Sequence, residues 1–213
     1  MTSETRDAQG LPWWPAAERN REPILEALKR VLPERGLLLE IASGTGQHAA
    51  HFVAGLGGWT IQPSDREPEH LETLRRRVEV AQDPRLLPPL ALDVTEAPPR
   101  LAPTAIYCAN MVHIAPWSAC VGLFTLADAL LDAGGLLLTY GPYSLHGEHT
   151  AESNARFDES LKARNPEWGV RDVDALSAVA RERGFELIET CRLPANNLLL
   201  VWRHGAPAAG RVM

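Results

Sequence analysis

Short apolar runs alternate with longer amphipathic segments along most of this chain. The short runs are bounded by turn residues, as β-strands are, and the longer segments carry apolar residues at helical spacing. Strands that are buried on both faces and alternate with helices favour a parallel sheet between helix layers. We expect strands at 37–42, 59–62, 86–92, 105–109, 136–141, 185–192 and 198–203, and helices at 16–32, 47–56, 67–81, 118–131, 151–163 and 172–183.

Right-handed crossovers between such strands make a doubly wound sheet. The last two expected strands are joined without a helix, which favours an antiparallel pair. The predicted fold class is therefore α/β, with a Rossmann-like, mostly parallel seven-stranded sheet and an antiparallel last strand. A chain of 213 residues suits one domain, which we place at 16–204, between an N-terminal lid segment, 1–15, and a flexible tail rich in Gly, Pro and Ala, 205–213.

Charge and composition exclude several classes of partner. The formal net charge is -6, whereas nucleic-acid binding needs a basic surface. The short basic cluster Arg75–Arg77 falls on an amphipathic helix, where we expect a solvated face. Neither a signal segment nor a membrane-spanning run is found, and three widely spaced cysteines give no metal or disulfide pattern. We expect a cytoplasmic protein with no nucleic-acid, membrane or metal partner.

The stretch "LLLEIASGTGQHAAHF" joins an expected strand to a helix through a turn of small residues. Gly44 and Gly46 would let the backbone approach a ligand closely. Glu40, inside the strand, would repel a pyrophosphate but suits a cation such as the sulfonium of S-adenosylmethionine. The pattern E-x-A-S-G-T-G resembles the glycine-rich first motif of class I methyltransferases, with Ala42 in place of the first glycine. A purely structural turn is the alternative.

Two more acidic residues occur where expected strands end. Asp65 comes about twenty residues after the turn, where a carboxylate accepts hydrogen bonds from ribose hydroxyls, although it could also cap the next helix. Asp93, in "LALDV", is placed where methyltransferases commonly meet the adenine amino group, although it could also cap a turn. A glycine turn and three acids at successive strand ends form a stronger pattern together than each does alone.

Several longer stretches carry a family resemblance. They are "AAERNREPIL", "EIASGTGQHAAHF", "QPSD", "NMVHIAPWSACVGLF", "GPYSLHGEHTAESNARFDESLKARNPEWGVRD" and "LPANNLLLVWRH". They resemble the methyltransferase-like protein 26 group over nearly the whole chain, from about Pro15 to His204. The resemblance implies a class I methyltransferase fold that uses S-adenosylmethionine, and it implies much less about the substrate.

By position, the resemblance implies four groups of cofactor contacts. The methionine half would be lined by Glu40, Ser43, Gly44, Thr45 and Gly46, and the ribose by Asp65. Asp93 and Val94 would flank the adenine, with Asn110 and Met111 beneath it. Arg19 and Asn20 would close over the cofactor carboxylate, for which an arginine is chemically suited; the alternative for Arg19 is an exposed charge on a helix.

Methyl transfer from a sulfonium requires alignment and often removal of a proton from the acceptor. The candidate catalytic residues are His113, His149 and Tyr140, which all lie near the ends of expected strands. For His149 the alternative is a histidine bonded to backbone. Aromatic side chains in loops could roof a small organic substrate, although packing would also explain them. The candidate substrate contacts are Trp14, Trp117, Tyr143 and Glu148.

The leading hypothesis is an S-adenosylmethionine-dependent methyltransferase acting on a small-molecule acceptor. An oxygen, sulfur or carboxylate acceptor is favoured, because "NMVH" stands where amino-group methyltransferases of bases carry "NPPY". A protein that binds S-adenosylmethionine or its demethylated product and acts through a partner, without transferase activity, is the alternative. Glu40 argues against a third class, the nicotinamide-dependent oxidoreductases. A homodimer is compatible with the sequence.

Overall fold

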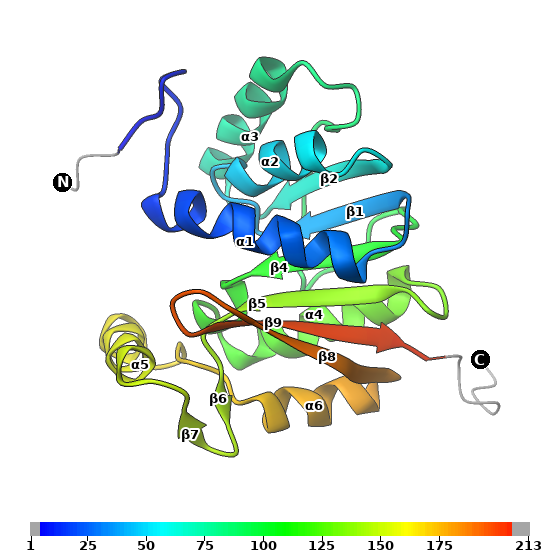
Figure 1. Cartoon of the computed structure of the whole chain (residues 1–213). Coiled ribbons are helices and arrows are strands. Elements are labelled where there is room, and N and C mark those ends of the chain that lie inside the picture. The colour runs from blue at the N-terminus through cyan, green and yellow to red at the C-terminus, as the bar shows by residue number, and fades with distance from the viewer. Residues whose placement is uncertain (1–4, 206–213) are drawn as a thin grey trace. The chain divides into compact units, whose positions relative to one another are not determined.

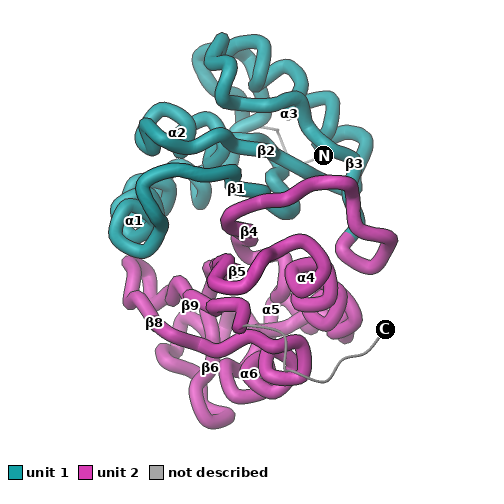
Figure 2. Tube along the Cα trace, turned by 90° about the vertical axis from the view of Figure 1, so that its right-hand side faces the viewer, with its two compact units in different colours: residues 1–93 teal, residues 94–213 magenta. Residues whose placement is uncertain are grey.

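The structure is a computed structural model that describes residues 5–205 (Figure 1). The chain forms two compact units, residues 1–93 and 94–213 (Figure 2). The strands of the main sheet follow the order β3-β2-β1 in the first unit and β4-β5-β9-β8 in the second. The predicted fold class is confirmed, because the seven-stranded sheet is mostly parallel and only the last strand runs antiparallel to its neighbours. Within the described part of the chain, no helix is long and apolar enough to cross a membrane.

The first unit consists of three parallel strands with helices between them. Its elements are α1 (Pro15–Val31), β1 (Gly36–Ile41), α2 (Gln47–Gly55), β2 (Trp59–Asp65), α3 (Pro68–Ala81) and β3 (Leu90–Ala91). In the register of β1 and β2, Leu38 is opposite Ile61, and both side chains are completely buried. Because the two strands are parallel, their carboxyl ends meet at one edge, which brings the glycine turn beside Asp65.

The strands around β2 differ from the expected ones. β2 continues through "PSD" to Asp65 instead of ending at Gln62, because Glu40 of β1 pairs with Pro63. β3 is reduced to Leu90–Ala91, since Pro88 and Pro89 lack the N–H groups that a strand needs. The Gln62 side chain donates to the Pro88 carbonyl oxygen over 2.7 Å and so satisfies part of the interrupted edge.

Helix α1 begins and ends beside prolines. Pro15 is at its first turn, where a missing N–H costs nothing. Leu32 caps the helix in an extended conformation, as a residue before Pro33 prefers. The expected helix at 16–32 is therefore confirmed to within one residue, although Pro23 lies inside it.

The second unit contains four strands of the main sheet, a small hairpin and three α-helices. Its elements are β4 (Ala105–Ala109), the 3₁₀ turn η1 (Met111–His113), α4 (Trp117–Leu130), β5 (Leu136–Gly141), β6 (Ser144–Leu145), β7 (Glu148–His149), α5 (Glu152–Arg164), α6 (Val173–Glu182), β8 (Phe185–Leu193) and β9 (Asn197–His204). Its core includes Phe124 and Trp202, whose rings meet edge to face at 5.3 Å. Trp202 is completely buried, and its Nε1–H donates to the Thr139 hydroxyl over 3.1 Å.

Two short elements of the second unit have no counterpart in the sequence prediction. β4 ends at Ala109, so Asn110 and Met111 do not end a strand but open the turn η1, which Asn110 enters with a φ of 60°. The hairpin β6–β7 turns through His146 and Gly147, which both have positive φ. Such turns depend on one or two residues that tolerate the left-handed region, and hydrophobic periodicity does not report them.

The cysteines are packing residues. Cys108 and Cys191 are buried at 1% and 6% exposure, and Cys120 is completely buried. Burial raises the pKa of the Cys120 thiol to about 11.

Candidate functional site

The turn after β1 is held against the end of β2 by hydrogen bonds. The Ser43 N–H donates to the Ser64 carbonyl oxygen over 2.8 Å, and the Gly44 N–H donates to Asp65 Oδ2 over 2.9 Å. Gly44 and Gly46 have φ values of 55° and 72°, in the left-handed region that glycine adopts without strain. The turn is therefore a rigid link between the carboxyl ends of two parallel strands.

The space beside both glycines is filled by other parts of the unit. A Cβ at Gly44 would collide with the indole ring of Trp14. A Cβ at Gly46 would lie 2.8 Å from a methyl carbon of Leu74 on α3. The sequence prediction was that these glycines make room for a ligand. In the structure, packing against Trp14 and Leu74 already requires glycine at both positions.

Glu40 is a buried carboxyl group with an unsatisfied oxygen. It is 2% exposed, and Oε2 has no hydrogen-bond partner among residues 5–205. Burial raises the pKa of Glu40 to about 8; the Ser43 hydrogen bond opposes this rise and the nearby charge of Asp65 adds to it. A buried acceptor without a partner is costly, so this position favours a ligand that brings a donor or a positive charge.

His48 lies beside Glu40, with Nδ1 at 3.9 Å from Glu40 Oε1. Its Nε2 lies 2.7 Å from Asn20 Oδ1, which can only accept, so the proton of the neutral ring is on Nε2. Burial lowers the pKa of His48 to about 4. A neutral His48 supplies no charge to Glu40, and it connects Asn20 on α1 to the site.

Asp65 remains an anion although it is buried. Burial would raise its pKa, but the adjacent His70 imidazole and hydrogen bonds from the N–H groups of Glu67 and Gly44 hold the pKa below its ordinary value. The Glu67 N–H is 3.0 Å from Oδ1, and His70 Nδ1 is 3.2 Å from the same oxygen. Asp65 therefore bonds to the backbone just before α3, whose N-cap is Glu67, and also presents a carboxylate beside the glycine turn.

The other predicted cofactor residues lie outside the hydrogen-bond network around the glycine turn. Arg19 is exposed on α1. Asp93 follows β3, and its Oδ2 is 3.6 Å from Arg66 Nη1. Val94, Asn110 and Met111 belong to the second unit, where Val94 is buried and the other two are half-buried. Contacts among the described residues thus connect Trp14, Asn20, Glu40, Ser43, Gly44, Thr45, Gly46 and Asp65.

His113 is a completely buried histidine in the second unit. Burial lowers its pKa to about 3, and the Arg171 cation acts in the same direction. The Arg171 backbone N–H donates to Nδ1 over 3.2 Å, so the neutral ring carries its proton on Nε2. Nε2 has no partner within residues 5–205, and any Cβ at Gly141 would collide with it. His113 is therefore a neutral donor at Nε2, with no free lone pair for a base.

Tyr143 and His149 follow β5 in the same unit as His113. The Tyr143 ring is completely buried and meets His113 edge to face at 4.7 Å, and burial raises the pKa of its hydroxyl. His149 is one-third exposed, and its Nε2 lies 3.5 Å from Asp158 Oδ2. Tyr140 is buried at 2% exposure, whereas Glu148 is exposed.

Arg171 organises the turn that carries His113, and charge patterns in the sequence do not identify it. Its Nε donates to the Val112 carbonyl oxygen over 2.9 Å and its Nη2 to that of Ala115 over 2.6 Å. Its guanidinium also lies 5.6 Å from the ring of Trp117. The position of Arg171 in the stretch "PEWGVRD" was the only signal, because backbone carbonyl acceptors leave no pattern in side-chain types.

Solved structures with this architecture define its class. An O-methyltransferase family protein from Burkholderia thailandensis superposes with a TM-score of 0.77 at 15% identity, covering 91% of this chain and 58% of its own. Human N-acetylserotonin methyltransferase with bound S-adenosylmethionine gives 0.76 at 16%, covering 90% and 53%. The mitomycin 7-O-methyltransferase MmcR gives 0.74 at 14%, covering 89% and 54%. The fold is thus that of class I methyltransferases, and the chain spans a little over half the length of these proteins.

Residues 12–204 match the model of one family, described as "Protein of unknown function (DUF938)". The match spans nearly the whole described chain, so this protein belongs to that family. The narrower resemblance to the methyltransferase-like protein 26 group stays a prediction. At sequence identities of 14–16%, the likeness to these solved structures shows the fold alone. The activity has to be argued from the residues of the site.

Proposed function

We propose that this protein is an S-adenosylmethionine-dependent methyltransferase that modifies a small organic acceptor. The observation that carries the proposal is the buried Glu40 carboxyl, whose Oε2 has no partner within the described chain. It lies directly behind the glycine turn, and Asp65 stands at the adjacent strand end. A ligand with a cationic methionine half supplies the positive charge that Glu40 lacks, and its ribose diol supplies donors for the remaining lone pairs of Asp65.

The residues fit this cofactor at three points. Glu40 can accept from the ammonium group or stabilise the sulfonium. Asp65 has lone pairs beyond those used by Gly44 and Glu67, so it can accept from ribose hydroxyls. Arg19 is exposed and can reach a carboxylate. Contacts of Asp93, Val94, Asn110 and Met111 with the adenine belong to the same proposal.

When bound, S-adenosylmethionine would supply the electrophilic methyl group. The chain would contribute orientation and proton transfer. We assign the proton-accepting role to His149, because its side chain is one-third exposed and its Nε2 lies 3.5 Å from Asp158 Oδ2, so Nδ1 is the nitrogen left for an acceptor proton. In this scheme His113 is a hydrogen-bond donor at Nε2. Tyr143, in the loop after β5, packs against the His113 ring, and Tyr140 lies in β5.

The acceptor atom is proposed to be oxygen, with sulfur or carboxylate as close chemical equivalents. Two of the similar structures are named as an O-methyltransferase family protein and a 7-O-methyltransferase. A base that removes a hydroxyl proton matches the role assigned to His149. Trp14, Trp117 and Glu148 are proposed to contact the acceptor, since all three are exposed.

Calorimetric titration with S-adenosylhomocysteine tests the cofactor proposal without knowledge of the acceptor. Because the pKa of Glu40 is about 8, binding of a cation at neutral pH should release a proton. Comparison of binding enthalpies in buffers of different ionisation enthalpy measures that release. Glu40→Gln should abolish it and weaken binding by about 10- to 100-fold, the value of a hydrogen bond to a charged group.

Glu34→Gln, an exposed carboxyl just before β1, is the matched control and should bind like the native protein. Absence of affinity in the native protein, or unchanged affinity in Glu40→Gln, would contradict the cofactor site. Turnover with a panel of hydroxyl, thiol and carboxylate acceptors then separates an enzyme from a binding protein. Binding without any turnover would favour the partner-dependent alternative.

A further inference from the structure

Arg77 is buried, whereas its two neighbours in the basic cluster are not. Arg77 is 8% exposed, and Arg75 and Arg76 are both exposed on α3. The expectation of a solvated face is therefore wrong for Arg77, because α3 turns this side chain towards the first unit. A buried guanidinium requires acceptors for its donors, and their identity reveals what the residue holds together.

Three donors of Arg77 reach two different segments. Nε donates to the Thr45 carbonyl oxygen of the glycine turn over 3.0 Å. Nη1 donates to Asp7 Oδ2 over 2.5 Å, and Nη2 donates to the Pro12 carbonyl oxygen over 3.0 Å. Only a planar fork of donors can reach three separate acceptors in this way. One side chain thus fastens the N-terminal segment to the turn behind which Glu40 lies.

The N-terminal segment, residues 5–14, is here called the strap, and it is ordered by its own contacts. Leu11 is 1% exposed, and its N–H donates to Asp7 Oδ1 over 2.9 Å. The Trp13 N–H donates to the Thr5 carbonyl oxygen over 2.8 Å. Burial would raise the pKa of Asp7, but the hydrogen bonds from Arg77 and Leu11 hold it below its ordinary value, so Asp7 is an anion opposite the guanidinium.

A second link between strap and turn runs through Gln47. Its Oε1 accepts from the Trp14 N–H over 2.7 Å and from the Thr45 hydroxyl over 2.9 Å. The Trp14 indole then covers Gly44, whose missing side chain makes room for it. The strap and the turn are consequently connected at two adjacent residues of the turn, by Arg77 at Thr45 and by Trp14 at Gly44.

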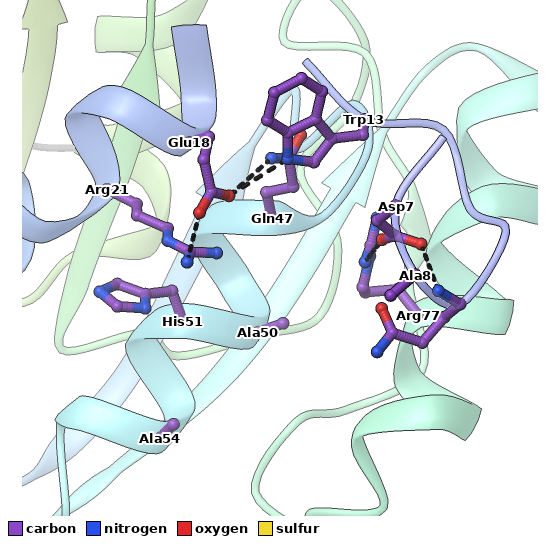
Figure 3. Close-up of a pocket in the computed structure, with 11 residues that line it drawn as sticks. Asp7, Ala8, Trp13, Glu18, Arg21, Gln47, Ala50, His51, Ala54 and Arg77 are labelled. Carbon is purple, nitrogen blue, oxygen red and sulfur yellow. Dashed lines mark hydrogen bonds and ion pairs between the residues drawn. The ribbon is translucent and has the colours of Figure 1, made fainter. Parts of the chain in front are cut away.

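A cavity of about 400 Å³ lies beside these links and is lined by the strap, α1, α2 and Arg77 (Figure 3). Its charged side chains already face one another: Asp7 pairs with Arg77, and Glu18 pairs with Arg21 at 2.5 Å. Glu18 also accepts from the Trp13 indole N–H over 3.2 Å. We place no ligand in this cavity, and the hydrogen bond from Trp13 to Glu18 further attaches the strap to α1.

We propose that Arg77 is a positioning residue that couples docking of the strap to binding of the nucleoside cofactor at the glycine turn. The inference rests on the proposed cofactor site. In this proposal the cofactor stabilises the turn that it contacts, the Thr45 carbonyl oxygen of the turn holds Arg77, and Arg77 holds the strap with Trp14 over Gly44. Coupling of two events is reciprocal, so a docked strap tightens binding by the same factor by which the ligand tightens the strap.

Hydrogen exchange of strap amides and calorimetry with S-adenosylhomocysteine test the two sides of the coupling. Arg77→Met keeps the aliphatic stem that packs near Gly46 and removes all three donors. It should expose the strap to fast exchange with or without ligand and weaken binding on the order of tenfold. Arg77→Lys should rescue only in part, because one ammonium group cannot span three acceptors. Arg76→Met, the exposed neighbour, should behave like the native protein.

Asp7→Asn separates coupling from a direct effect on the turn, because Asp7 contacts Arg77 and the strap but not Thr45. It should loosen the strap and weaken binding together. Circular dichroism and the unfolding midpoint establish that each variant is folded. A loosened strap with native affinity in Asp7→Asn or Arg77→Met overturns the coupling, as does native strap exchange in Arg77→Met. A native protein that fails to bind overturns the proposed function itself, whereas native binding with uncoupled variants overturns only this inference.

Discussion

Among single residues, Glu40 sets a pH dependence of stability. Its pKa rises from an ordinary 4.5 to about 8 on burial, so the folded state binds this proton more tightly than the unfolded state. The resulting stabilisation is complete below the unfolded pKa and is lost as pH rises through the folded pKa. Relative to Glu40→Gln, we expect the unfolding temperature of the native protein to decrease as the pH rises from about 5 to about 9.

Thermal unfolding of both proteins across this range measures the difference. His48, whose pKa is lowered to about 4, contributes stability that is lost as pH falls, and this change is common to both proteins. The exposed control Glu34→Gln should track the native protein throughout. Parallel curves for the native protein and Glu40→Gln would mean that Glu40 is solvated or already paired.

The positions of residues at strand ends could be predicted from the sequence more readily than their burial and hydrogen-bond partners. Glu40 and Asp65 were placed correctly beside one turn, because parallel strands bring their carboxyl ends to one edge. Arg77 was misplaced, because its burial depends on the strap, which is distant in sequence. The proton position of His113 depends on one backbone N–H of Arg171, and no side-chain pattern encodes it.

At the scale of elements, the turn between β8 and β9 stores backbone strain. Ala195 has a φ of 59°, in the left-handed region that costs a residue with a Cβ about 1–2 kcal/mol. Ala195→Gly should remove that cost and, after the extra entropy of glycine, stabilise the protein by about 0.5–1 kcal/mol. Chemical denaturation measures this change as a higher midpoint at an unchanged slope.

The same substitution in a helix provides a control of opposite sign. Ala175 is exposed on α6, where replacement by glycine should destabilise by about 1 kcal/mol. Equal effects of Ala195→Gly and Ala175→Gly would show that the turn carries no strain. The turn also contacts α5, where Asn154 donates to the Asn196 carbonyl oxygen over 3.0 Å.

Long periodic elements were predicted within one or two residues, whereas short ones were not. The helices at 118–131 and 172–183 match α4 and α6 closely, because their apolar spacing extends over several turns. β3 and η1 could not be predicted in this way, because an element of two or three residues is too short to show a periodic pattern. Their presence depends on prolines and on a positive φ at Asn110.

For the whole molecule, the fold class could be predicted because the alternation of strands and helices is a property of the entire chain. The lid at 1–15 and the tail at 205–213 remain predictions, and residues 1–4 and 206–213 lie outside the described part. Cytoplasmic location and a homodimer also remain predictions. The identity of the methyl acceptor depends on side chains in several loops, and hydrophobic periodicity carries no information about these.

Ligand-dependent stability of the whole chain distinguishes the cofactor classes that a Rossmann-like fold can serve. A ligand that binds only the folded state at 100 times its Kd adds about 2.7 kcal/mol. For a chain of 213 residues, each kcal/mol shifts the unfolding midpoint by about 2–4 °C, so S-adenosylhomocysteine should raise it by about 5–10 °C. NAD should leave it unchanged, because its pyrophosphate would place negative charge beside the Asp65 anion at the turn. A shift with NAD and none with S-adenosylhomocysteine would contradict the proposed methyltransferase and favour a nicotinamide-dependent oxidoreductase with the same sheet.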